Sequence, residues 1–292
     1  MDPRDLPETW PYRSAGRSVR VGPHRWWVVD TGPATAPCLL LLHGLGASGH
    51  SFRNLMPLLA AHWRLIVPDL PGQGASQTGA RHRIALAPLA ADLGQLCTAL
   101  QIQPAAVVGH SAGGAIALQM ALTTPGLPVI GINAALGHFE GAAGVLFPVM
   151  AQALSAMPFA ATGFSRLWGN ARTINRLLAG TGSQIDATGR EQYLHLVRDP
   201  SHVRGALDMM ANWRLDPLLA DLPKINAPVL LLAGQDDKAV PPRVSHEAAQ
   251  AIPGATCQPI VGGHLVQEDK ADLVAAAIQN WLQAKGASAK IR

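Results

Sequence analysis

The residues from Val107 to Ala117, VVGHSAGGAIA, place one serine between two glycines where an apolar run ends and an alanine-rich segment begins. This serine, Ser111, is the centre of a G-x-S-x-G pattern. A serine on a tight turn from a strand into a helix adopts strained backbone angles, and flanking glycines remove the side chains that would clash. Its hydroxyl is exposed beside the first N–H groups of the helix, which can stabilise an oxyanion. We therefore predict that Ser111 is a nucleophile; the alternative is an N-cap serine at a glycine-rich helix start.

A serine hydroxyl is a poor nucleophile unless a base takes its proton, and that base needs an acid to orient it. The segment VGGHLV supplies His264 near the end of the chain, where the order serine, acid, histidine places the base. The segment LLAGQDDKAVPP offers Asp236 and Asp237 for the acid. An aspartate in such a loop can instead cap the turn. The pattern therefore predicts a catalytic triad and leaves the choice between the two aspartates open.

Buried strands alternating with helices must position these residues. Five apolar runs are expected as strands: Cys38 to Leu42, Leu65 to Val67, AAVVGHS, LPVIGINAA and APVLLLAGQDD. Helices are expected between them, for example at Leu86 to Leu100 and Ala112 to Leu122. This alternation predicts an α/β fold with a mostly parallel sheet. Sites in such sheets form where strands end, and the polar residues there are His43, Asp69, Ser111, Asp237 and His264.

The alternation fails between about residues 138 and 214, where the sequence indicates several helices separated by breaks. We therefore expect a core formed by residues 1–137 and 215–292 and a helical cap formed by residues 138–214. Residues 141–165 carry no charge, but two prolines and several glycines argue against a membrane-spanning helix.

Composition excludes several classes of function. The 292 residues are 48% hydrophobic, and the net charge of +4 is scattered without a basic stripe, so nucleic acid is not an expected partner. The three cysteines lie far apart, which argues against disulfides or a CxxC metal site. The sequence has no GxxxxGK[ST] loop and no HExxH spacing, so we expect neither an ATPase motor, nor a bound metal, nor another cofactor. The polar N-terminus has no signal-peptide pattern, and the expected location is the cytoplasm, including the inner face of the membrane.

Four motifs together resemble the α/β-hydrolase superfamily: HG-x-G at residues 43–46, D-x-P-G-x-G at 69–74, the serine motif, and G-x-x-D at 234–237. The resemblance implies that Asp237 is the acid of the triad. It also implies that the backbone N–H groups of Leu45 and Ala112 form an oxyanion hole. His43 and Asp69 would then shape loops, and His110 would line the serine turn without taking the proton.

The cap sequence points to one family within this superfamily. LFPVMA and the stretch from Arg176 to Pro223 are similar to the magnesium-chelatase accessory proteins of bacteriochlorophyll biosynthesis. The similarity runs from about Ser14 to Ala284. It implies a role at the magnesium chelatase step, with chelatase subunits and an apolar metabolite such as a tetrapyrrole as partners. A serine hydrolase acting on an ester or related bond is the first hypothesis. A non-catalytic porphyrin-binding or scaffold protein is the second, and peripheral membrane docking through the cap is the third.

The cap contains large apolar residues in a segment without charge, and we expect some of them to face an apolar cavity or a partner. The alternative is that they pack only on each other and on the sheet. They are Phe139, Leu146, Phe147, Met150, Met157, Phe159, Phe164 and Trp168.

Overall fold

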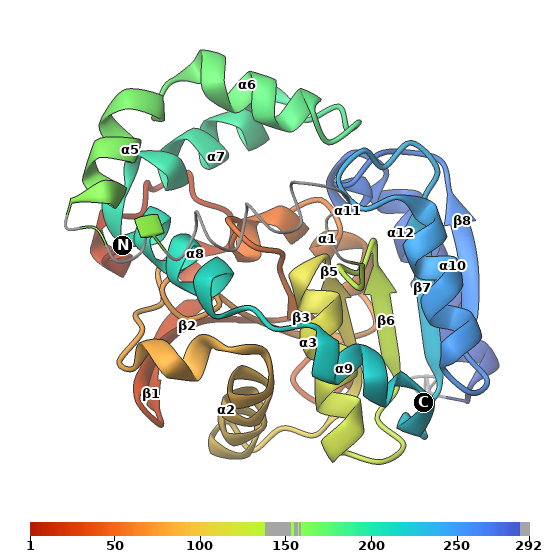
Figure 1. Ribbon diagram of the computed structural model, residues 1–292. Coiled ribbons are helices and arrows are strands. Elements are labelled where there is room, and N and C mark those ends of the chain that lie inside the picture. Colours follow the sequence, from red (N-terminus) through yellow and green to blue (C-terminus); the bar gives the residue numbers. More distant parts are fainter. Residues whose placement is uncertain (138–152, 155–156, 158, 287–292) are drawn as a thin grey trace.

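The computed structural model describes residues 1–137, 153–154, 157 and 159–286, which form one eight-stranded sheet with helices on both faces (Figure 1). The strands are β1 (Gly16–Val21), β2 (His24–Thr31), β3 (Cys38–Leu42), β4 (Arg64–Pro68), β5 (Pro104–His110), β6 (Val129–Ile132), β7 (Val229–Gly234) and β8 (Thr256–Ile260). Their order across the sheet is β1-β2-β4-β3-β5-β6-β7-β8. β2 runs antiparallel to both of its neighbours, and the other pairs are parallel. The predicted α/β fold with a mostly parallel sheet is confirmed; β8 was not among the expected strands.

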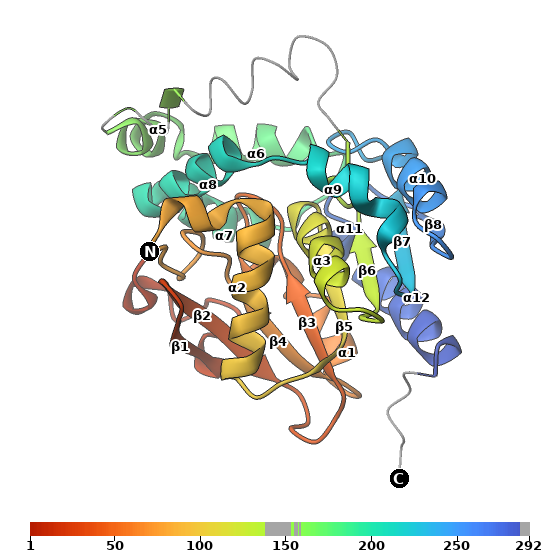
Figure 2. The same ribbon diagram turned by 60° about the horizontal axis from the view of Figure 1, so that its bottom comes forward.

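Helices cover both faces of the sheet, as Figure 2 shows from a second direction. Those next to the sheet are α1 (Met56–Leu59), α2 (Leu86–Ala99), α3 (Ala112–Thr123), α9 (Asp216–Asp221), α10 (Pro242–Ala251), α11 (Val266–Asp269) and α12 (Ala271–Ala284). In β3, Leu40 and Leu42 pack on the side of α2 and α3, whereas Leu39 and Leu41 pack on the side of α1 and α12. All four leucines are fully shielded from solvent. This two-sided burial explains why β3 reads as a continuous apolar run.

Among the described residues after β6 there is no further strand before β7, as predicted, and helices follow one another. They include α5 (Ala160–Trp168), α6 (Ala171–Ala179), α7 (Ala187–Arg198) and α8 (Pro200–Asn212), which lie together at one end of the sheet (Figure 1). We call these four helices the cap helices. α6 packs on α7, and α5 packs on both α8 and α7. The division into a core and a cap at residues 138 and 214 stays a prediction.

The N-terminal segment holds the cap helices against the rest of the molecule. Leu6 and Trp10 are buried in one cluster with Ile174 and Leu178 of α6 and Tyr193 of α7. Since these five side chains come from three separate parts of the chain, their burial stabilises the position of α6 and α7.

The turn from β5 into α3 has little room for side chains. A Cβ atom on Gly109 would lie 2.2 Å from the carbonyl oxygen of Gly113, and one on Gly113 would lie 2.1 Å from the carbonyl oxygen of Leu42. Ser111, between them, has φ = 52° and ψ = −116°, a backbone conformation that side chains disfavour. The predicted strand, turn and helix around the serine motif are therefore present, with a strained serine at the turn.

A buried ion cluster joins the cap helices to the rest of the molecule. The Arg53 guanidinium, after a short helix at Gly49–Phe52, donates hydrogen bonds to Glu268 of α11 and to Asp186, which caps the start of α7. The Tyr193 hydroxyl of α7 donates to the other carboxylate oxygen of Glu268 at 2.6 Å. Burial raises the pKa of Glu268 to about 7, and Arg53 opposes that rise. Removing one partner of such a cluster leaves an uncompensated buried charge.

Replacing Ser111 tests the strain at the turn. Glycine adopts positive φ without penalty, so Ser111→Gly should be more stable than Ser111→Ala by about 1 kcal/mol, measured by urea unfolding. The same pair of changes at Ser245, inside helix α10, is the control and should give the opposite order because glycine weakens a helix interior. Equal stability of the two Ser111 variants would show that the turn is not strained.

Replacing Arg53 tests the ion cluster. Arg53→Met should lower the free energy of unfolding by about 3–5 kcal/mol, because Glu268 would remain buried without its cation. Arg17→Met removes an exposed partner that lies 3.8 Å from Asp30, and should change stability by under about 1 kcal/mol. The loss in Arg53→Met should be smaller at pH 5 than at pH 8, because a protonated Glu268 needs no cation. A loss that is independent of pH would contradict this account.

Candidate active site

His264 and Asp237 form a buried hydrogen-bonded pair where β7 and β8 end. The Nδ1 atom of His264 lies 2.7 Å from Oδ2 of Asp237. The other oxygen of Asp237 accepts hydrogen bonds from the backbone N–H groups of Ala239 and Val240, at 2.7 and 2.8 Å. These contacts hold the carboxylate still, and the carboxylate orients the imidazole. Asp236, the other candidate acid, is exposed.

The backbone around His264 is held from two directions. The N–H of His264 donates to the carbonyl of Thr181, at 3.0 Å, in the loop between α6 and α7. The carbonyl of His264 accepts from Nδ2 of Asn133 at 2.9 Å, and Oδ1 of Asn133 accepts from the N–H of Gly234 at 2.6 Å. Asn133 therefore ties the end of β7 to the histidine loop. The sequence analysis did not single out Asn133. Its position directly after the buried strand β6 is the signal that could have found it, because polar residues at strand ends form the sites of such sheets.

Ser111 lies beside the loop that follows β3. A Cβ atom on Gly44 would lie 3.1 Å from the Cβ of Ser111, so Leu45, the next residue, belongs to a loop packed against the serine turn. Ala112 is the first residue of α3, and its N–H is one of the helix's first-turn donors. The structure thus brings Ser111, Leu45 and Ala112 into one region, and the role of Leu45 and Ala112 as an oxyanion hole stays a prediction.

Two further polar residues hold the loop that contains Leu45. The N–H of Gly46 donates to Oε1 of Gln73 at 2.6 Å, and the carbonyl of Gly46 lies 3.2 Å from Nε2 of His202 in α8. Nδ1 of His202 accepts from the N–H of Gly74 at 3.0 Å, so Nε2 carries the proton and donates to Gly46. Gln73 lies inside the D-x-P-G-x-G motif at a position that the pattern leaves variable, and no spacing signal pointed to His202.

His43 and Asp69 shape loops, as expected. Nε2 of His43 accepts from the N–H of Leu70 at 2.8 Å, and its protonated Nδ1 donates to the carbonyl of Gly44 at 2.8 Å. Asp69 accepts from the N–H groups of Gly49 and Ala75, at 2.7 and 2.8 Å. Burial raises the pKa of Asp69 to about 6. Both side chains are hydrogen-bonded to backbone groups, so they hold loops in place and do not take part in proton transfer.

His110 lies next to the His264 ring, with ring centroids 4.7 Å apart. Its Nε2 lies 2.9 Å from the carbonyl of His264. Burial lowers the pKa of His110 well below its usual value, which keeps this ring neutral beside His264. A neutral ring here places no positive charge beside the His264 imidazole.

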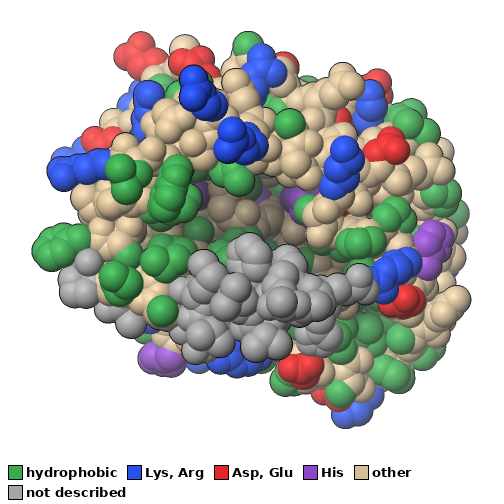
Figure 3. Space-filling model, turned by 45° about the horizontal axis from the view of Figure 1, so that its top comes forward, with side chains coloured by type: hydrophobic (Ala, Val, Ile, Leu, Met, Phe, Trp, Pro, Cys, Tyr) green, Lys and Arg blue, Asp and Glu red, His purple; other side chains and the backbone are tan. Residues whose placement is uncertain are grey.

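The face that carries the cap helices is hollowed, and histidine side chains lie in the floor of the hollow (Figure 3). Among the described apolar residues of the cap, Met157, Phe159 and Trp168 are exposed, and Phe164 packs on Trp168 with ring centroids 4.8 Å apart. Met157, Phe159 and Trp168 face no closed cavity, and the expectation that some of the apolar residues of the cap face a cavity or a partner stays a prediction. Phe139, Leu146, Phe147 and Met150 lie outside the described residues.

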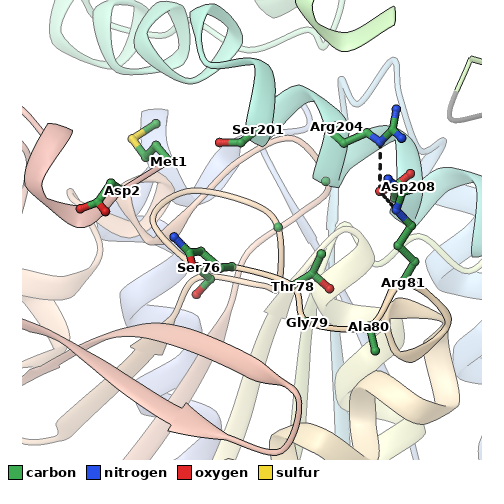
Figure 4. A pocket seen from close by; sticks show the side chains of 13 residues that line it. Met1, Asp2, Ser76, Thr78, Gly79, Ala80, Arg81, Ser201, Arg204 and Asp208 are labelled. Atoms are coloured by element: carbon green, nitrogen blue, oxygen red, sulfur yellow. Dashed lines mark ion pairs between the residues drawn. The ribbon is translucent and has the colours of Figure 1, made fainter. Parts of the chain in front are cut away.

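A second pocket, of about 490 Å³, lies between α8 and the loop from Gly72 to Arg81 (Figure 4). Arg81 and Arg204 both point toward Asp208, at 3.3 and 3.4 Å from its carboxylate. Arg81, Arg204 and Asp208 are therefore paired with one another, and none of the predicted triad residues lines this pocket. Within the described residues, no group of three or more His, Cys, Asp or Glu side chains is placed to hold a metal ion.

Comparison with solved structures supports the fold. The chain superimposes on the putative lipase of Acinetobacter baumannii with a TM-score of 0.74 at 23% identity, covering 92% of this chain and 91% of that one. A putative epoxide hydrolase from Pseudomonas aeruginosa gives a TM-score of 0.74 at 20% identity, covering 92% and 95% of the two chains. At these identities the likeness concerns the fold alone.

Sequence comparison is more specific. A family model for the alpha/beta hydrolase fold matches residues 37–271. The pimeloyl-[acyl-carrier protein] methyl ester esterase of Xanthomonas oryzae is 32% identical over 256 residues, covering 84% of this chain and 95% of that protein. The magnesium-chelatase 30 kDa subunit of Rhodobacter capsulatus is 57% identical over 283 residues, covering 97% of this chain and all of that protein. The chain therefore belongs to the α/β-hydrolase family and is closely related to the magnesium-chelatase 30 kDa subunit.

Proposed function

We propose that this protein is a serine hydrolase that cleaves an ester or related bond in an apolar metabolite at the magnesium chelatase step of bacteriochlorophyll biosynthesis. The observation that carries the proposal is the buried pair of His264 and Asp237 near the strained Ser111 turn. The relatedness to a magnesium-chelatase subunit supports the place in metabolism, and the relatedness to a methyl ester esterase supports the type of bond.

The hydrogen bond to Asp237 sets the protonation of the histidine ring. Because a carboxylate only accepts, Nδ1 of neutral His264 carries the proton and Nε2 keeps its lone pair. In the proposed reaction, Nε2 takes the proton of Ser111 while Oγ attacks the acyl carbon. The N–H groups of Leu45 and Ala112 then stabilise the oxyanion, and His264 returns its proton to the leaving alcohol. Water, activated by the same histidine, releases the acid from Ser111.

Substitution of the triad tests this mechanism. Ser111→Ala and His264→Ala should abolish hydrolysis of p-nitrophenyl acetate above background, and Asp237→Asn should lower kcat by about 10²–10⁴-fold because the imidazole loses its orientation. Asp236→Asn is the matched control and should retain nearly full activity, since its side chain is exposed. If Asp236→Asn were the damaging change, the assignment of the acid would be wrong.

A non-catalytic role in the chelatase is the second candidate, favoured by the name of the 57% identical relative. A fluorophosphonate probe distinguishes the two. Labelling of the wild type but not of Ser111→Ala would show an activated serine. No labelling, together with quenching of tryptophan fluorescence by protoporphyrin IX at micromolar concentration, would favour a porphyrin-binding accessory protein.

A further inference from the structure

Large exposed hydrophobic side chains are concentrated in one short stretch of the chain. Of the nine that are exposed in the described residues, five lie between residues 157 and 177. Phe159 is 83% exposed, Leu167 70%, Leu177 55% and Trp168 48%. Single exposed hydrophobic residues are normal, but such a concentration marks an interaction surface.

Leu167 and Trp168 lie in α5, Leu177 lies in α6, and Phe159 directly precedes α5. In α6, Ile174 and Leu178 are buried toward α7, which leaves Arg172, Arg176 and Leu177 exposed. In α5, Ala161 and Ser165 are the buried residues, and Arg166, Leu167 and Trp168 are exposed. Both helices lie at the periphery of the molecule in Figure 1 and Figure 2. We call Phe159, Arg166, Leu167, Trp168, Arg172, Arg176 and Leu177 the α5–α6 surface.

The charge on the α5–α6 surface has one sign. The 45 residues from 141 to 185 contain Arg166, Arg172 and Arg176 and no Asp, Glu or Lys. All three arginines are exposed. A surface with this composition repels other cations and attracts a surface of negative charge.

We propose that the α5–α6 surface binds the face of an anionic lipid bilayer. Interfacial helices that lie on membranes combine large apolar side chains with arginine or lysine and lack acidic residues between them. Arginine stems and a tryptophan ring suit the boundary between head groups and acyl chains, because each has an apolar body and a polar end. No described helix is long and apolar enough to cross the bilayer. The inference does not depend on the proposed hydrolase activity.

Vesicle flotation tests the proposal on the full chain. The wild type should float with vesicles of phosphatidylcholine and phosphatidylglycerol mixed about two to one, and should remain at the bottom with phosphatidylcholine alone. Raising the salt concentration should release it, since the arginine contribution is screened. Activity toward p-nitrophenyl acetate is measured on the same samples, so that failure of membrane binding and failure of the hydrolase proposal are separate results.

Paired variants assign the binding to this surface. Arg172→Gln with Arg176→Gln, and separately Leu167→Ser with Trp168→Ser, should each lower the partition coefficient about tenfold or more. The control combines Leu273→Ser with Arg20→Gln, an exposed leucine of α12 and an exposed arginine of β1, and should bind as the wild type does. Melting temperatures verify that every variant is folded. Absence of wild-type flotation, an equal loss in the control, or a stable dimer that does not bind vesicles would overturn the proposal.

Discussion

The start of α3 lies so close to the end of β3 that no side chain fits at Gly113, where a Cβ atom would lie 2.1 Å from the carbonyl oxygen of Leu42. This contact determines the shape of the turn between β5 and α3, and with it the positive φ of Ser111. It also places the loop after β3 beside the serine, because Gly44 packs against the Cβ of Ser111. A backbone-to-backbone contact of this kind cannot relax by rotating a side chain, so the positions of Ser111 and Leu45 are set by the packing of the sheet itself.

The segment that follows His264 also holds the cap helices in place. Glu268 follows His264 by four residues, and its two oxygens are bound by Arg53 and Tyr193. Ser183, in the loop between α6 and α7, accepts from the N–H of Leu265 at 2.8 Å. The segment that carries the candidate base is therefore bonded to the loop before α7 through Leu265 and to α7 itself through Glu268. Movement of α7 would shift His264, so the geometry of the pair with Asp237 and the position of the cap are coupled.

Most of the sheet could be predicted because its central strands are buried on both faces and read as apolar runs. β8 could not, because it lies at the edge of the sheet and only Ile260 is buried among its residues Thr256–Ile260. The candidate triad residues could be predicted because the backbone geometry imposes motifs on the sequence around them. Asn133 and His202 could not, because each acts on the backbone of a loop distant in the chain, and such a pairing leaves no local pattern.

The contact between α8 and the loop after β4 limits how the hollow can change its width. A Cβ atom on Gly205 of α8 would lie 1.9 Å from the carbonyl oxygen of Gly72, and His202, one turn earlier, is bonded to both Gly46 and Gly74. α8 is thus seated directly on the backbone of the core. Because backbone meets backbone at this contact, a shift of α8 relative to the loop would also break the hydrogen bonds of His202 to Gly46 and Gly74, so α8 and this loop move as one body.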